Sequence, residues 1–229
     1  MARQVGSSEV NESPATDSGR QMRSRLLDVA AQMFMLQGLA GVTVSAVAKA
    51  ADAFPSQVTY YFRTKDAMFV EAACREMLYV AHAAEKTSRL ARSAHTYLES
   101  LTKSTLGQPG LSMFVEALVL TRRQPALQPL IARTIERLHY EGERAFHNVR
   151  TSRGWKIQHS DGITAQRFWA LVMALSLRNE ALGIDDRATQ SEAIRLLSAD
   201  FIEISQTQHL GLQVVTSSKE SANGRRHTS

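Results

Sequence analysis

Histidine, cysteine and carboxylate side chains perform most catalysis and metal binding in proteins. In this sequence their spacing matches no known catalytic or metal-binding motif. The single cysteine, Cys74, has no partner for a disulfide or a zinc cluster, and no nucleophile signature surrounds it. The chain contains no His-Glu-x-x-His motif, no pair of Glu-x-x-His motifs and no glycine-rich phosphate loop. We therefore expect no enzyme, no metal site and no cofactor. The seven histidines are scattered: His82, His95, His139, His147, His159, His209 and His227.

Basic side chains gather near the amino end of the chain. Residues 20–65 hold six positive and two negative side chains, so this stretch carries +4 of the formal net charge of +5. Such a concentration of charge favours a phosphate-rich partner, although an ordinary solvated basic surface would give the same count. The charged side chains are Arg20, Arg23, Arg25, Asp28, Lys49, Asp52, Arg63 and Lys65.

The bulk composition is typical of a globular protein. With 229 residues, 44% of them apolar, the chain can bury a core as one large domain or as a small domain and a larger one. No apolar run approaches the roughly 18 residues that a membrane helix needs, and the first 20 positions are polar. These features predict a cytoplasmic protein with no membrane partner.

Apolar residues recur at intervals of three and four almost throughout, which predicts an all-α fold of about nine helices. The first helix is expected at about residues 20–37, before Gly38, a residue suited to the left-handed turn that ends a helix. The Thr43 hydroxyl can cap a short second helix. Pro55 can start a third, because a proline in the first turn loses no helical hydrogen bond. A long fourth helix follows at about 65–86.

Three short helices, with a tight turn between the second and third, describe a helix-turn-helix head on a larger body. Five further helices follow, separated by Gly and Pro breaks. Both chain ends are polar and lack periodicity, so we expect them to be flexible. The expected organisation is an amino-terminal arm at 1–19, a helix-turn-helix domain at 20–65, a helical ligand-binding and dimerisation domain at 66–212 and a flexible tail at 213–229.

The residues of the head resemble the tetracycline-repressor (TetR/AcrR-type) family of bacterial transcriptional regulators. The matching elements are LLDVAAQMFMLQG, TVSAVAKAADA and VTYYFRTKDAM, in the order and spacing of the family. The resemblance covers about 50 of the 229 residues, and its most specific part is the aromatic-aromatic-Phe-x-Thr-Lys stretch. It implies a protein that binds double-stranded DNA, most commonly as a repressor.

The resemblance also implies roles for particular residues. Thr43 matches a helix cap that touches a DNA phosphate. Tyr60 and Tyr61 lie where family members contact the DNA backbone, and a phenolic hydroxyl can donate to a phosphate oxygen, although one of them could instead pack against Phe62. Lys65 matches the family's phosphate-binding lysine, next to the amides that open the fourth helix.

Base readout is expected from Ser56 and Gln57, since the first turn of a recognition helix points into the major groove. We favour Gln57, because glutamine can make a paired donor and acceptor contact with adenine, although it can also end on a phosphate. Arg25 and Arg63 are further candidates for phosphate contacts or for a solvated surface. Thr59, also on the recognition helix, replaces the family's commonest tyrosine.

Two residues of the turn also depart from the family pattern. Asp52 stands where the family usually has glycine, and Phe54 stands where it has a small polar cap. Asp tolerates the left-handed conformation better than most residues, but Phe is a poor cap.

Specific DNA binding by such a head typically needs a second copy roughly 34–36 Å away, one turn of the duplex, so we expect a homodimer. The nearly all-apolar helix around 168–177 and the striped last helix predict a four-helix interface, with packing inside one chain as the alternative. The predicted contacts are Phe168, Val172, Leu175, Ile194, Leu197 and Phe201.

The family typically senses a small molecule in its helical body, which implies an apolar or amphipathic ligand. Large, adaptable side chains suit such a pocket, although they are as typical of a plain core. The candidates are Met77, Tyr97, Met113, Phe114, Trp169 and Met173. The alternative to a DNA-binding regulator is a helical adaptor that binds another protein.

Overall fold

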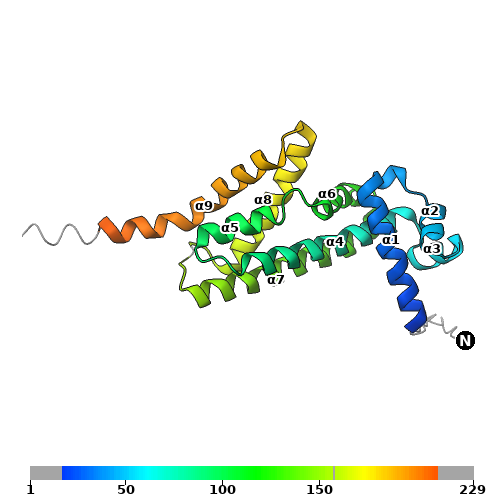
Figure 1. Ribbon diagram of the computed structural model, residues 1–229, viewed down its shortest axis with the longest axis horizontal. Coiled ribbons are helices and arrows are strands. Elements are labelled where there is room, and N and C mark those ends of the chain that lie inside the picture. Colours follow the sequence, from blue (N-terminus) through cyan, green and yellow to red (C-terminus); the bar gives the residue numbers. More distant parts are fainter. Residues whose placement is uncertain (1–16, 157, 211–229) are drawn as a thin grey trace, which may run out of the picture. The chain divides into compact units, whose positions relative to one another are not determined.

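The structure is a computed structural model that describes residues 17–156 and 158–210, with side chains described as far as Ser198. The predicted tail and the first 16 residues of the predicted arm lie outside these ranges. Within them the chain forms nine α-helices, one short 3-10 helix and no strand, which confirms the all-α prediction (Figure 1). The chain divides into two compact units, one ending at Ala72 and the other beginning at Ala73.

The first unit holds the three amino-terminal helices and the start of a fourth. These are α1 (Asp17–Gly41), α2 (Val44–Ala50), α3 (Pro55–Phe62) and α4 (Lys65–Ser88), the last of which continues into the second unit. Helices α2 and α3 pack on each other and on α1. The stripe that contains Leu26, Ala30 and Phe34 is buried in this unit, and the Phe34 ring meets Phe69 edge to face at 5.1 Å.

Two backbone positions shape the turns of the first unit. Gly38 interrupts α1 with φ 67° and ψ 174°, a conformation open almost only to glycine. The helical hydrogen bonding resumes after it as far as Gly41, so α1 extends beyond its predicted end. Asp52, between α2 and α3, has φ 50°, as expected of a residue that accepts the left-handed region.

The second unit contains the rest of α4 and five more α-helices. They are α5 (Ala94–Lys103), α6 (Pro109–Thr121), α7 (Gln128–Arg153), α8 (Asp161–Leu182) and α9 (Asp186–Leu210), with a 3-10 turn, η1 (Pro125–Leu127), before α7. Helices α7 and α8 pack closely against each other, and α9 returns along α8 and α5 (Figure 1). No helix of the described residues is both long and apolar enough to cross a membrane.

Close approach between α7 and α8 depends on Gly142. A β-carbon at that position would lie 3.0 Å from the Ala165 Cβ and 3.3 Å from the Trp169 Nε1. The Trp169 indole is buried and donates a 3.1 Å hydrogen bond to the carbonyl of Leu138. The single thiol, Cys74, is also interior to this unit, at 4% exposure. The second unit is therefore held by a largely apolar core, which also contains buried hydroxyl groups and the amide of Asn179.

A charged contact joins the end of α7 to the start of α8. Arg150 donates two 2.8 Å hydrogen bonds to the carboxylate of Asp161, and the His147 Nδ1 lies 3.1 Å from one of the same oxygens. The hydrogen bonds from Arg150, and then the contact with His147, lower the pKa of Asp161 against the opposing effect of burial. Asp161 thus remains charged and paired across the turn between the helices.

Candidate nucleic-acid interface

The exposed side of α3 presents hydroxyl groups. Val58 and Phe62, four residues apart, are buried and fix which side of the helix faces the core of the first unit. Ser56, Thr59 and Tyr60 lie on the exposed side, and Tyr60 is 76% exposed. The Thr59 hydroxyl donates to the Pro55 carbonyl at 3.2 Å and keeps its acceptor capacity. This side of α3 can therefore hydrogen-bond to an external partner.

The two tyrosines of α3 are not equivalent. Tyr61 is half-buried, and its ring lies 6.4 Å from that of Phe62. It also meets the Tyr60 ring edge to face at 5.1 Å, so it supports the more exposed tyrosine from one side. The geometry favours Tyr60 over Tyr61 for the predicted phosphate contact, and the packing of Tyr61 on Phe62 agrees with the alternative considered from the sequence.

Gln57 has a structural role that the sequence analysis did not anticipate. Its side chain is half-buried, and the carboxamide oxygen accepts a 2.9 Å hydrogen bond from the backbone N–H of Phe54. It thereby accepts from the N–H of the N-cap residue, as the N3 side chain of a capping box does. The carboxamide oxygen keeps a second lone pair and the amide nitrogen keeps both protons, so the paired contact with adenine stays a prediction.

Lys65 likewise has a role within the first unit. Its ammonium donates to the carbonyls of Leu39 at 2.9 Å and of Val42 at 3.1 Å, and the side chain is half-buried. It ties the start of α4 to the segment that joins α1 and α2. An ammonium carries three protons, so one remains for the predicted phosphate contact.

Thr43 caps α2 as predicted. Its hydroxyl accepts a 3.1 Å hydrogen bond from the N–H of Ala46, and its backbone is extended, as expected at an N-cap. The side chain is exposed, so its second lone pair faces solvent. The additional contact to a DNA phosphate stays a prediction.

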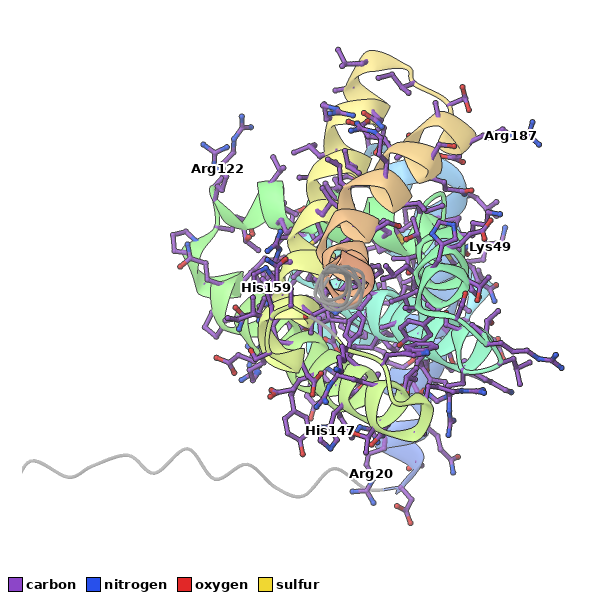
Figure 2. The ribbon with its side chains drawn as sticks, turned by 90° about the vertical axis from the view of Figure 1, so that its left-hand side faces the viewer. Arg20, Lys49, Arg122, His147, His159 and Arg187 are labelled. Atoms are coloured by element: carbon purple, nitrogen blue, oxygen red, sulfur yellow. The ribbon has the colours of Figure 1, made fainter. Side chains whose placement is uncertain are left out.

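Positive side chains accompany α3 in the first unit. Arg25 is exposed and donates to the carbonyl of Asp52 at 3.2 Å, which ties the turn before α3 to α1. Arg63 is exposed at the end of α3, with φ 64°. Lys49, which the sequence analysis counted but did not assign, lies at the surface of α2 (Figure 2). Arg23 is engaged within the unit, over the Phe62 ring at 5.3 Å.

The predicted ligand-lining residues lie in the interior of the second unit. Five of them are at most 5% exposed, and they are Met77, Tyr97, Met113, Phe114 and Trp169. Met173 is half-buried. Burial agrees with a pocket lining and equally with a plain core, so the pocket stays a prediction. The Tyr97 hydroxyl, however, has no hydrogen-bond partner in the described part of the chain although it is buried.

The predicted dimer contacts need correction. Four of them are at most 5% exposed within a single chain, and they are Phe168, Val172, Leu175 and Leu197. A side chain that its own chain already covers cannot also form the surface that a partner meets. Ile194 is half-buried, and the side chain of Phe201 lies outside the described part of the structure. As far as Ser198, where the described side chains end, the large exposed apolar side chains of these two helices are Ile163, Leu177, Leu182 and Leu196.

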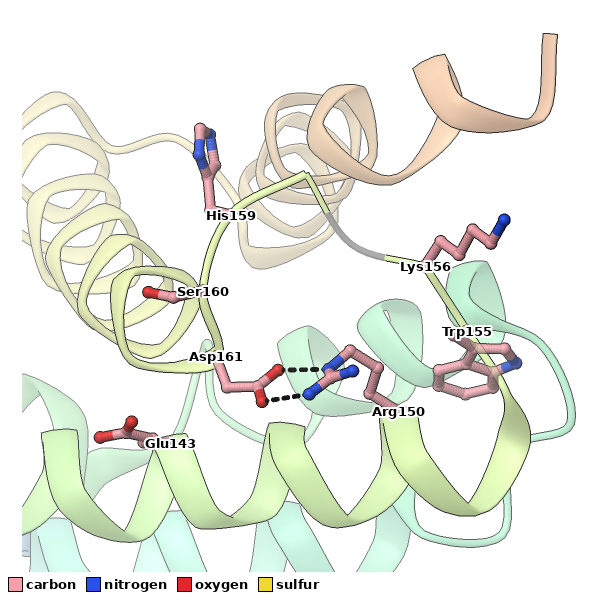
Figure 3. A pocket seen from close by; sticks show the side chains of 7 residues that line it. All are labelled: Glu143, Arg150, Trp155, Lys156, His159, Ser160 and Asp161. Carbon is pink, nitrogen blue, oxygen red and sulfur yellow. Dashed lines mark hydrogen bonds and ion pairs between the residues drawn. The ribbon is translucent and has the colours of Figure 1, made fainter. Parts of the chain in front are cut away.

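A cavity of about 520 Å³ opens between the end of α7 and the start of α8 (Figure 3). Charged side chains of both signs line it together with an indole ring and the apolar stems of long side chains: Glu143, Arg150, Trp155, Lys156, His159, Ser160 and Asp161. The Arg150–Asp161 pair spans the two helices within it (Figure 3). None of the predicted ligand-lining residues borders this cavity. Among the described residues, no three His, Cys, Asp or Glu side chains come together to hold a metal ion.

Comparison with known families matches both units. Residues 26–72 match the profile described as "Bacterial regulatory proteins, tetR family", and residues 94–198 match that described as "Bacterial transcriptional repressor C-terminal". No curated protein sequence matches the chain at a significant level. The first match covers the helices that carry the exposed hydroxyls and cations described above.

Solved structures share the fold. A protein assigned as a transcriptional regulator from Rhodococcus sp. RHA1 is 31% identical, with a TM-score of 0.70 over 79% of this chain and 95% of its own. A TetR-family regulator from Rhodococcus sp. is 19% identical, with a TM-score of 0.60 over 80% and 99%. A regulator from Saccharomonospora viridis, solved with choline, is 17% identical, with a TM-score of 0.59 over 78% and 96%.

The two profile matches and the 31% identical structure, of which this chain covers nearly the whole length, decide the assignment. They confirm the resemblance found in the head and extend it to the helical body. The chain belongs to the tetR family of bacterial transcriptional regulators, with a DNA-binding helix-turn-helix in its first unit.

Proposed function

We propose that the protein is a ligand-responsive repressor that binds a palindromic operator as a homodimer. The observation that carries the proposal is the exposed side of α3, where Ser56, Thr59 and Tyr60 point away from the core. Exposed Arg25 and Arg63 lie at either end of that helix. Hydroxyls and guanidinium groups are the usual donors to phosphate oxygens, which position a recognition helix on the duplex. A regulator of this kind works in the cytoplasm, where the DNA is.

A dimer would be built on the outer apolar side chains of α8 and α9 rather than on the buried ones. Leu177 and Leu196 are exposed at 49% and 40%, and Ile163 at 48%. Removing such side chains from water favours association roughly in proportion to the apolar area covered. Charged substitutions at Leu177 or Leu196 should therefore shift the protein towards the monomer, which sedimentation would measure.

The ligand part of the proposal rests on Tyr97. Burial, and then the nearby Glu85 carboxylate, raise the pKa of its phenol, which therefore stays protonated and remains a donor. A buried hydroxyl without a partner is costly, and an acceptor on a ligand would remove that cost. The proposed ligand is thus a small amphipathic molecule with an apolar body and one acceptor. Choline, present in the Saccharomonospora viridis structure, is a compact cation without such an apolar body and provides a contrasting compound for the ligand test.

Selection of bound duplexes from a random pool tests the DNA part directly. The full chain should enrich a palindrome whose half-sites lie roughly one helical turn, 34–36 Å, apart. Binding should weaken steeply with salt, because phosphate neutralisation releases counterions. A helical adaptor, the alternative function, would enrich no sequence and show no salt dependence with DNA.

Repression and ligand response have separate tests. A reporter whose promoter overlaps the selected palindrome should be expressed less when the protein is present. A ligand that prefers the unbound arrangement must lower operator affinity by the ratio of its affinities for the two forms. Unchanged operator affinity across a broad screen of amphipathic compounds would count against ligand control and leave the DNA-binding function intact.

A further inference from the structure

Phe54 places an exposed phenyl ring at the very start of the recognition helix α3. It is the N-cap residue, with an extended backbone at φ −91° and ψ 146°, and its side chain is 75% exposed. Helix N-caps favour Ser, Thr, Asp and Asn, whose oxygens accept from the first amides of the helix. A phenyl ring offers no such oxygen and is largely in water. Neither the capping of α3 nor the core of the first unit accounts for this residue.

The backbone around Phe54 is held from several sides. Its own N–H donates to the Gln57 carboxamide at 2.9 Å, and the N–H of Ala53 donates to the Ala48 carbonyl at 2.9 Å. The preceding residue, Asp52, is tied to α1 through Arg25 at 3.2 Å. Because these bonds fix the turn, the direction in which the ring leaves the chain is set before any partner binds. Little conformational freedom of the backbone remains to be lost on binding.

We propose that Phe54 is a specificity-determining residue whose ring packs against the 5-methyl group of a thymine in the major groove. The first residues of a recognition helix approach base edges when the helix enters the groove. Of the groups on those edges, the thymine methyl is the apolar one, and Phe is among the side chains that contact it. The inference rests on the proposed DNA-binding function and names one base that the operator must contain.

The surroundings favour DNA over an apolar protein as the partner of the ring. After the exposed Pro55, the exposed side chains along α3 are those of Ser56, Thr59 and Tyr60, which all carry hydroxyls. Arg25 lies against the turn that carries Phe54. An apolar protein surface would leave these hydroxyl and guanidinium groups without partners, whereas a duplex offers acceptors around each thymine methyl.

Replacing thymine by uracil removes the methyl group and nothing else, so it isolates the proposed contact. Loss of one buried methyl corresponds to roughly fourfold in affinity, and loss from both half-sites of a palindrome to about 15-fold. We expect such a loss for the wild-type protein at one thymine of each half-site, measured by titration of the selected duplex. Uracil at the remaining thymines should have little effect.

The variant Phe54→Ser provides the matching protein change. Serine is a good N-cap, so α3 should form, and a thermal melt verifies this. The variant should bind thymine and uracil duplexes equally at the position in question, while Phe54→Leu should keep part of the difference. Leu36→Ser, which removes an 84% exposed side chain of α1, should behave like the wild type.

Two results would overturn the proposal while leaving the regulator function in place. One is a selected operator whose half-sites contain no thymine that is sensitive to uracil. The other is a Phe54→Ser protein that keeps the full uracil sensitivity of the wild type. If the wild-type protein bound no duplex at all, the proposed function would fail, and the thymine contact with it.

Discussion

Substitution of Lys65 tests whether a residue expected to contact DNA also stabilises the first unit. Its ammonium donates to the carbonyls of Leu39 and Val42 at 2.9 and 3.1 Å. Hydrogen bonds from a charged donor contribute about 1.5–3 kcal/mol each when well buried, and solvent screening reduces this for a half-buried group. We therefore expect Lys65→Met to lower the free energy of unfolding of the first unit by about 2 kcal/mol.

Methionine keeps the apolar stem of Lys65 and removes only the donor. The loss of stability should therefore measure the hydrogen bonds to Leu39 and Val42. Urea unfolding of the full chain measures it, with Lys49→Met as the matched control. Lys49 is exposed on α2, and its replacement should change stability by no more than about 0.5 kcal/mol. If Lys65 also contacts a phosphate, a plot of log binding constant against log salt concentration should become less steep by about one in the variant. Wild-type stability in Lys65→Met, with DNA binding lost, would refute the structural role.

Three further substitutions test other parts of the molecule. Asp161→Asn breaks the bidentate contact with Arg150 and should lower the free energy of unfolding near neutral pH, by a modest amount because solvent screens the exposed guanidinium. That contact lowers the pKa of Asp161 from its ordinary value of 3.8. The stabilisation is therefore present above pH 3.8 and is lost as the pH falls through the lower pKa of the folded state. In acid unfolding, the free energies of unfolding of wild type and variant should become equal below that pKa. Gly142→Val places a side chain against Ala165 and should destabilise the second unit by about 1–3 kcal/mol in thermal melts. Tyr60→Phe removes one exposed hydroxyl and should weaken binding to all duplexes alike, by about 1 kcal/mol in a shift assay.

Matched controls accompany these three variants. Glu136→Gln and Ala132→Val change exposed residues of α7 and should leave stability unchanged within about 0.5 kcal/mol. Tyr140→Phe removes the hydroxyl of an exposed tyrosine of the second unit and should not alter DNA binding. If Gly142→Val had the melting temperature of the wild type, the close approach of α7 and α8 would be contradicted. A Tyr60→Phe protein that loses affinity for some sequences and not others would contradict the phosphate assignment.

Sequence periodicity was sufficient for the fold class because the helical stripes are regular. The stripe through Leu26, Ala30 and Phe34 is buried, and Gly38 adopts a positive φ near the predicted end of the first helix. Helix ends were less predictable, since they depend on local hydrogen bonds. Helix α1 begins at Asp17 and ends at Gly41, outside its predicted bounds of about 20–37 at both ends.

The candidate site was predicted by position but not by hydrogen bonding. The sequence placed Gln57 and Lys65 at the head, yet it could not show that the first accepts from the backbone of Phe54 or that the second reaches Leu39, 26 residues away. Four of the six predicted dimer contacts, Phe168, Val172, Leu175 and Leu197, are instead buried within one chain, for a related reason. An apolar helix such as α8 must be covered on several sides, but its sequence does not say whether its own chain or a second chain covers it.

The buried thiol of Cys74 can report local opening of the second unit. The thiol is 4% exposed, and no other cysteine exists in the chain, so any labelling reagent must wait for the surrounding helices to separate. When reclosing is faster than the reagent, the labelling rate gives the free energy of that opening, as amide exchange does for backbone groups. The rate at which a thiol reagent labels the wild-type protein can therefore be compared with and without an operator duplex or a small molecule. A slower or faster rate shows that the partner raises or lowers the free energy of opening of the second unit.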